Sequence, residues 1–338
     1  MNHMKKHALA LLVMTFMFSL NKGYFTVHAG DPRPGRMAPI PAGTFQMGDS
    51  FGEGDPDELP VHPVTLDSFH ISSTETTNGQ YCGFLNQAED NGWITVTGGV
   101  VYKAGSGPNH PYCNTTASSS HSPISYTGGV FSVKAKGGRD MSNDPVSQVS
   151  WYGAVAYCNW LSWQEDRRPC YNLSTWKCDF SKNGYHLPTA AQWEYAARGG
   201  LSRRRFPWGD SINHDHANYR ANGSAYKYDT SPYTAWTFHP DWNDGTYPYT
   251  CPVGSMPPNG YGLYGMTGNV WEWCNDWYDW AYYASSPPKN PTGPDSGTYR
   301  VLRGGSWSNN AGSCRVADPT YGRPGYRSYY GGFRVSLD

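Results

Sequence analysis

The sequence predicts one large domain with little regular secondary structure and long ordered loops. Aromatic residues are abundant, with 14 Trp, 26 Tyr and 12 Phe among 338 residues, whereas charged residues make up only 16%. The 39 Gly and 26 Pro favour turns over long helices and strands. Because aliphatic residues are sparse, aromatic side chains must supply much of the core. A chain this rich in aromatics is not expected to be disordered.

Short strands, turns and hairpins are expected along most of the chain. Residues 37–47 read as a strand and a turn, and residues 62–71 alternate in polarity as a strand does. Between them, the acidic residues 53–58 lack the ligand spacing of a calcium-binding hand and are predicted to form a solvated loop. Residues 93–145 are rich in Gly, Ser and Thr and suggest hairpins, and residues 206–210 form a turn.

Three helices are predicted from their N-terminal capping residues. The first begins near Thr76 or Thr77, and the second follows Ser150, after which apolar residues recur on one face. The third follows Thr189, where Gln192 completes a capping box.

The N-terminal segment, residues 1–29, has the features of an export signal. Lys5 and Lys6 supply positive charge, residues 8–20 are apolar but too short to cross a bilayer comfortably, and residues 27–29 offer a cleavage site. An uncleaved anchor is the alternative. Either interpretation places the folded part outside the cytoplasm, secreted or periplasmic, and signal cleavage leaves no membrane contact. The nearly balanced 26 basic and 27 acidic residues give no electrostatic reason to expect nucleic acid as a partner.

Eight cysteines follow the signal segment: Cys82, Cys113, Cys158, Cys170, Cys178, Cys251, Cys274 and Cys314. An even number of cysteines in an oxidising compartment favours disulfides, and Cys170 with Cys178 is the strongest candidate pair. A zinc site is the alternative, but no Cys-x-x-Cys spacing supports it.

Two Gly- and Trp-rich motifs, residues 268–273 and 303–307, are the most specific features of the sequence. They belong to an ordered series of short motifs: residues 41–48, 60–64, 75–78, 149–151, 187–189, 193–196, 206–209, 268–273, 303–307 and 332–335. In this order the motifs resemble the formylglycine-generating enzyme (sulfatase-modifying factor) family over residues 38–337. The resemblance implies an α+β, C-type-lectin-like fold with low regular secondary structure and long ordered loops.

The resemblance also implies two structural calcium ions. The expected ligands are Gly268, Asn269, Val270 and Glu272 for the first ion, and Asn218, Tyr219, Asp244 and Thr246 for the second. Carboxylate, amide and carbonyl oxygens from tight turns suit Ca²⁺. Gly265 departs from the family pattern, where Asp or Asn is common. Alternatively, Asn269 and Glu272 cap buried backbone groups and bind no metal.

The chemistry implied by the resemblance depends on two cysteine thiolates that bind Cu(I) downstream of Gly-Gly-Ser. Here Asn309 stands at the first thiol position and only Cys314 remains near the second. An amide cannot replace a thiolate ligand of Cu(I). Cys274 is the alternative partner of Cys314, in a thiolate pair or in an ordinary disulfide. The groove is expected to be lined by Trp271, Ser306, Trp307, Asn309, Cys314 and Arg315, with Trp271, Ser306, Cys314 and Arg315 as catalytic candidates.

Three functions remain open from the sequence. The first is an oxidoreductase that converts a cysteine or serine of a protein or peptide substrate, with a sulfatase as the candidate partner, to formylglycine. The second is a non-catalytic, calcium-stabilised, lectin-like module that binds peptide or glycan. The third is a periplasmic maturation enzyme for a small molecule. His214 and His216 around Asp215 suggest a non-haem iron site, but side chains two positions apart in a loop usually point apart.

Overall fold

The computed structural model describes residues 35–338, so the predicted signal segment lies outside the described residues. This part of the chain contains three α-helices: α1 (Asn78–Asp90), α2 (Trp151–Gln164) and α3 (Ala190–Ala197). None of these helices combines the length and the apolar character needed to span a membrane. The strands are β1 (Met37–Ile40), β2 (Gly43–Met47), β3 (His62–Leu66), β4 (Phe69–Ser72), β5 (Ile94–Thr97), β6 (Val100–Lys103), β7 (Pro111–Asn114), β8 (Ile124–Thr127), β9 (Val130–Val133), β10 (Tyr171–Asn172), β11 (Lys177–Cys178), β12 (Trp271–Trp277), β13 (Arg300–Arg303), β14 (Pro319–Gly322), β15 (Gly331–Gly332) and β16 (Ser336–Leu337).

All three helices begin at the predicted caps. In α1 the Thr77 hydroxyl accepts a hydrogen bond from the Gln80 backbone N–H, and the Gln80 side chain accepts one from the Thr77 N–H. Thr189 and Gln192 form the same reciprocal box at α3. The Ser150 hydroxyl accepts from the backbone N–H of residue 153 at α2. These local bonds satisfy backbone donors that no helical carbonyl can reach.

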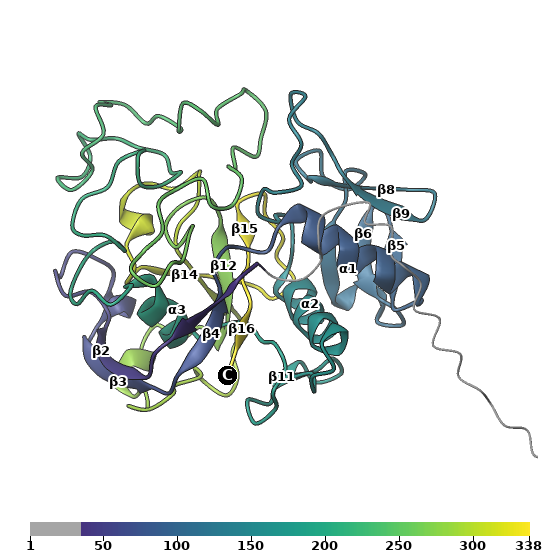
Figure 1. Ribbon diagram of the computed structural model, residues 1–338, viewed down its shortest axis with the longest axis horizontal. Helices are drawn as coiled ribbons and strands as arrows, with labels where there is room; N and C mark the ends of the chain where they lie inside the picture. The colour runs from purple at the N-terminus through teal and green to yellow at the C-terminus, as the bar shows by residue number, and fades with distance from the viewer. Residues whose placement is uncertain (1–34) are drawn as a thin grey trace, which may run out of the picture.

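The sheets join segments that are far apart in sequence. A four-stranded sheet has the order β14-β13-β12-β15. A three-stranded sheet has the order β1-β4-β16, in which the last strand of the chain pairs with β4. The single strand expected over residues 62–71 is instead two strands, because β3 pairs with β2 while β4 pairs with β1 and β16. In Figure 1, α1, α2 and the β5–β9 hairpins lie on one side of β12 and β16, and β2, β3, α3 and the long loops lie on the other.

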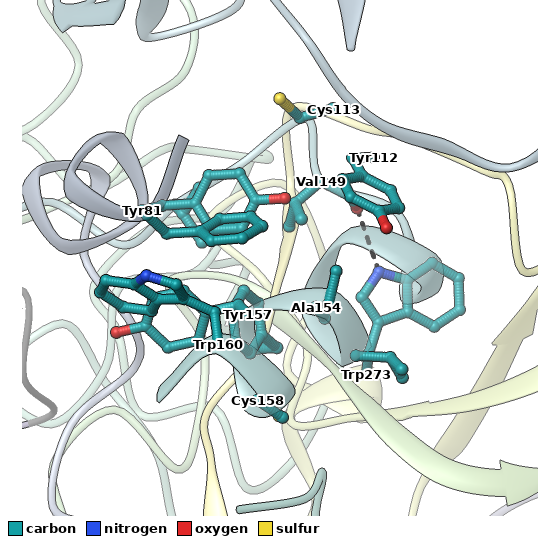
Figure 2. Packing of buried hydrophobic residues seen from close by; sticks show 14 of the residues in the cluster. Tyr81, Tyr112, Cys113, Val149, Ala154, Tyr157, Cys158, Trp160 and Trp273 are labelled. Atoms are coloured by element: carbon teal, nitrogen blue, oxygen red, sulfur yellow. Dashed lines mark hydrogen bonds between the residues drawn. The ribbon is translucent and has the colours of Figure 1, made fainter. Parts of the chain in front are cut away.

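Aromatic side chains fill the core, as the composition predicts. Figure 2 shows Tyr81, Tyr157 and Trp160 gathered between α1 and α2, with Trp273 of β12 donating its indole N–H to the Val149 carbonyl at 3.1 Å. The Tyr81 and Tyr157 rings stack with centroids 5.9 Å apart. The Trp273 indole N–H thus has an acceptor inside the core, as burial requires.

A buried carboxylate connects several of these elements. Glu272 of β12 accepts hydrogen bonds at 2.7 Å from Trp193 Nε1 of α3 and, through both oxygens, from Arg334 Nε and Nη2. Arg334 also donates to the carbonyl oxygens of Ser72 and Tyr264, at 3.0 and 2.8 Å. The Arg334 side chain is fully buried and that of Glu272 is 1% exposed. One guanidinium thus fastens β4, β12, the turn at residue 264 and the C-terminal segment together.

Replacing Arg334 with Leu should lower the free energy of unfolding by about 3–5 kcal/mol, because Glu272 would remain buried with its charge unpaired. Urea denaturation followed by tryptophan fluorescence measures the loss. The exposed Arg36, changed to Leu, is the matched control and should cost less than about 0.5 kcal/mol. Equal stability of the two variants would contradict a structural role for the Glu272–Arg334 pair.

Candidate functional site

A cavity of about 460 Å³ opens between the start of β12, the end of β13 and the loops that follow β13. We name it the Trp271 cavity. Its walls include Trp271, Asn309, Asp318, Tyr321, Tyr326 and Tyr330. The cavity therefore lies where the two Trp-rich motifs meet.

A hydrogen-bond network links three of the predicted groove residues. Asn309 Oδ1 accepts from Trp271 Nε1 at 2.9 Å and from the Ser306 hydroxyl at 2.5 Å. The Asn309 backbone N–H donates to the Ser306 carbonyl at 3.0 Å. The residue at the predicted first thiol position is thus a fixed hydrogen-bond acceptor at the edge of the cavity.

Cys314 does not face this cavity. Its side chain is fully buried in a cluster with Phe206, Ala217 and Ala311, and burial raises the pKa of its thiol. Cys274 belongs to a different core cluster, with Met47 and other apolar residues. The structure does not bring these two thiols together, and Asn309 supplies no sulfur. The residues present therefore do not fit a Cu(I) ion.

Arg315 is held in a buried ion pair and is not among the residues that line the cavity. Its Nη1 and Nη2 donate to the two oxygens of Glu58 at 2.7 and 2.5 Å, and its Nη2 lies 3.6 Å from Asp318 Oδ1. The expectation that residues 53–58 form a solvated loop is wrong for Glu58, whose side chain is fully buried because Arg315 pairs with it. Asp318 does line the cavity, and burial raises the pKa of this carboxyl while Arg315 opposes the rise.

The first predicted calcium set is already engaged by protein donors. Asn269 Oδ1 accepts from the Cys251 N–H at 3.0 Å and from Asn218 Nδ2 at 3.3 Å, while both oxygens of Glu272 are held as described above. Gly265 has a φ of +64°, and a Cβ there would lie 2.5 Å from both carboxylate oxygens of Glu75. Any side chain at this position would collide with that carboxylate. The side-chain oxygens of Asn269 and Glu272 are thus already used by protein donors, and calcium binding by this set, with Gly268 and Val270, stays a prediction.

Part of the second predicted calcium set is engaged by protein groups as well. Asp244 Oδ2 lies 3.2 Å from Lys136 Nζ, and Asp244 Oδ1 accepts from the Thr246 N–H at 3.1 Å. The Tyr219 carbonyl lies 3.0 Å from His214 Nε2. Asn218 uses its amide N–H to bond the carbonyl of residue 249, at 2.8 Å, whereas its Oδ1 is buried without a hydrogen-bond partner in the part of the chain that the structure describes. Within residues 35–338, no three His, Cys, Asp or Glu side chains are arranged to hold a metal ion.

The two histidines of the predicted iron site lie outside the hydrogen-bond network of Trp271, Ser306 and Asn309. His214 contacts the Tyr219 carbonyl, whereas His216 contacts Asn213 and stacks on Trp208, so the two rings have different surroundings.

All eight cysteines carry free thiols in the structure. A hydrogen bond joins the thiols of Cys170 and Cys178 at the β10–β11 hairpin; it lowers the pKa of Cys170, while burial raises the pKa of Cys178. Their pairing as a disulfide stays a prediction.

The observed architecture defines the class of protein. Few short helices, a small central sheet, long ordered loops and a cavity formed by C-terminal motifs make an α+β, C-type-lectin-like domain. Residues 25–338 match the model of the sulfatase-modifying factor enzyme 1-like domain, and the chain belongs to this family.

Several known proteins are similar to this chain over most of its length. A formylglycine-generating enzyme from Streptomyces coelicolor is 36% identical over 327 residues, which cover 92% of each protein. One from Mus musculus is 32% identical, covering 91% of this chain and 77% of the mouse protein. Among solved structures, Treponema denticola variable protein 1 has a TM-score of 0.60 at 26% identity, with 89% of this chain and 94% of that one covered.

Sequence reasoning missed the tyrosines of the cavity. Tyr321, Tyr326 and Tyr330 line it, and Tyr321 and Tyr326 are 50% and 47% exposed. The signal available in the sequence was the high content of Tyr, Ser, Asn and Gly in residues 306–332. The general abundance of tyrosine in the chain hid that signal.

The burial of Cys314 predicts its reactivity. In the native protein, kept reduced with a phosphine, iodoacetamide should label Cys314 on the order of 100-fold more slowly than in the denatured protein, because labelling requires the cluster to open. Peptide mass spectrometry after timed quenching measures both rates. Rapid native labelling of Cys314 would show that its thiol reaches solvent.

Proposed function

We propose that this chain binds a segment of a partner protein in the Trp271 cavity and does not carry out copper-dependent oxidation. The segment is a cysteine- or serine-containing stretch of the sulfatase type. The observation that carries the proposal is Asn309, whose amide oxygen holds Trp271 and Ser306 where a thiolate would be needed. Cys314, sealed in an apolar cluster, supplies no second ligand beside it.

The walls of the cavity support polypeptide binding. Tyr326 and Tyr330 hydrogen bond through their hydroxyls at 2.9 Å, which presents two aromatic rings together at the rim. Large, partly exposed tyrosines beside Ser and Asn side chains are typical of protein-binding loops, because they supply contact area at a low cost in conformational entropy. Asp55 adds a carboxylate that suits a basic residue of the partner.

The names of the relatives support a protein partner and also indicate a second candidate function. Three relatives are formylglycine-generating enzymes at 32–36% identity over most of this chain, and such enzymes act on a residue of a polypeptide. Trp271 and Ser306 stand at active-site positions that the resemblance implies, and Cys314 stands at or near the second thiol position. Oxidation of a bound cysteine to formylglycine is therefore the second candidate function.

A Cu(I) titration with an oxidation assay separates the two functions. The reduced wild-type protein and the Cys314→Ser variant should both fail to take Cu(I) from a chromogenic chelator, because no thiolate pair exists to hold the metal. Neither protein should convert the cysteine of a Cys-x-Pro-x-Arg peptide to formylglycine under O₂, as read by mass spectrometry. Uptake of one Cu(I) by the wild type together with peptide conversion would establish the enzyme instead.

Binding of the same peptide tests the cavity directly. Fluorescence anisotropy with a labelled Cys-x-Pro-x-Arg peptide and its serine analogue should give similar Kd values. Tyr326→Ala and Tyr330→Ala should weaken binding by about tenfold or more, which corresponds to about 1.4 kcal/mol. Trp280→Ala removes an aromatic side chain that is 67% exposed and outside the cavity, and it should leave Kd unchanged. No binding by the wild type, or equal loss in all three variants, would rule out the proposed site.

A further inference from the structure

Lys136 is a buried cation surrounded by groups that favour positive charge. Its side chain is only 6% exposed, and its Nζ donates to the Pro248 carbonyl at 2.5 Å. The carboxylate of Asp244 lies 3.2 Å away, and the centroid of the Tyr249 ring lies 5.6 Å away. Lysine is rarely buried to this extent unless it is paired. A carbonyl, a carboxylate and an aromatic face together make a cation site within the fold.

This site overlaps the second set of oxygens that the sequence assigned to calcium. Asp244 was the only carboxylate in that set, and the structure pairs it with Lys136. The Asn218 side chain bonds the carbonyl of residue 249, next to the carbonyl that Lys136 holds. Burial lowers the pKa of Lys136, and the hydrogen bond with Asp244 opposes this shift.

We propose that the ammonium group of Lys136 takes the place of a divalent metal ion at this position. It fastens the turn at residues 244–250 to the turn at residues 136–139, so that this part of the domain is held without calcium. Arg139 strengthens the same connection, since its Nη2 donates to the Thr250 carbonyl at 3.3 Å and to Asp144 at 2.9 Å. Two neighbouring cations therefore hold backbone carbonyls of one turn.

The fastened turn bears on the candidate site. The rings of Tyr247 and Tyr249 each lie 5.2 Å from Trp307, centroid to centroid, and Trp307 directly follows Ser306. The Cys251 N–H at the end of the turn bonds Asn269 Oδ1, at 3.0 Å. Loosening Lys136 would thus disturb the aromatic side chains packed behind Ser306. The proposal itself concerns the cation and stands whether or not the cavity binds a peptide.

Thermal unfolding of the full protein tests the proposal without any substitution. The Tm of the wild type should be unchanged when EDTA is replaced by millimolar CaCl₂, and isothermal titration should detect no Ca²⁺ binding. A fall in Tm on chelation, or a rise with CaCl₂, would show that a metal holds the site and would overturn the proposal.

Lys136→Met is the decisive variant, and the exposed Lys134, changed to Met, is its matched control. Lys136→Met should lower Tm by several degrees relative to the control. CaCl₂ should raise the Tm of Lys136→Met but not that of the control, because the Asp244 and Pro248 oxygens released by Lys136 can accept the ion. Equal Tm values for the two variants would overturn the proposal, as would the absence of any calcium effect on Lys136→Met. If Lys136→Met does not fold, Asp244→Asn replaces it, since Asp244 is 38% exposed. That variant should show a smaller loss, and an unchanged Tm would count against the proposal.

Discussion

The carboxylate of Glu272 and the guanidinium of Arg334 form the contact on which the domain depends. Arg334 reaches the Ser72 carbonyl across 262 positions of sequence, and Trp193 contributes the third donor from α3. Each partner is buried, so none can turn to water if another is removed. The N-terminal strands, α3, β12 and the C-terminal segment are therefore ordered together. A network in which every member is satisfied also specifies a single arrangement of these elements.

Buried arginine–carboxylate pairs also occur elsewhere in the interior, where aliphatic side chains would be expected. Arg303 donates to Glu194 at 2.5 Å and Arg198 donates to the same carboxylate at 2.7 Å, while Arg315 joins Glu58 across 257 positions. Burying a charge is costly unless it is paired and hydrogen bonded, and each of these arginines has a carboxylate partner. With few aliphatic residues available, these paired charges connect α3 to β13 and the short helical turn at Glu58 to the segment that holds Arg315.

Local signals in the sequence predicted local structure well. The capping residues Thr77, Ser150 and Thr189 each start a helix, because a cap depends on residues only two or three positions away. The burial of Glu58 could not be predicted, since its partner Arg315 lies far along the chain. The division of residues 62–71 between two sheets could not be predicted for the same reason, because it depends on distant strands. Hydrophobic alternation indicates a strand but does not identify its partners. Motif order predicted the fold and pointed to Asn309, whereas the hydrogen-bond partners and burial of the site residues required coordinates.

The proposed difference from the formylglycine-generating enzymes concerns the groups at the edge of the cavity. A shared frame does not carry a shared activity, because activity depends on the groups that face the ligand. Asn309 has a side chain of moderate size that accepts two hydrogen bonds, so the backbone around Ser306 and Trp271 can keep its shape without a metal. An amide oxygen at this point supports recognition, whereas a thiolate would support binding of a soft metal. Asn309 thus holds the walls of the cavity through its amide oxygen, and this contact is the basis of the proposed binding function.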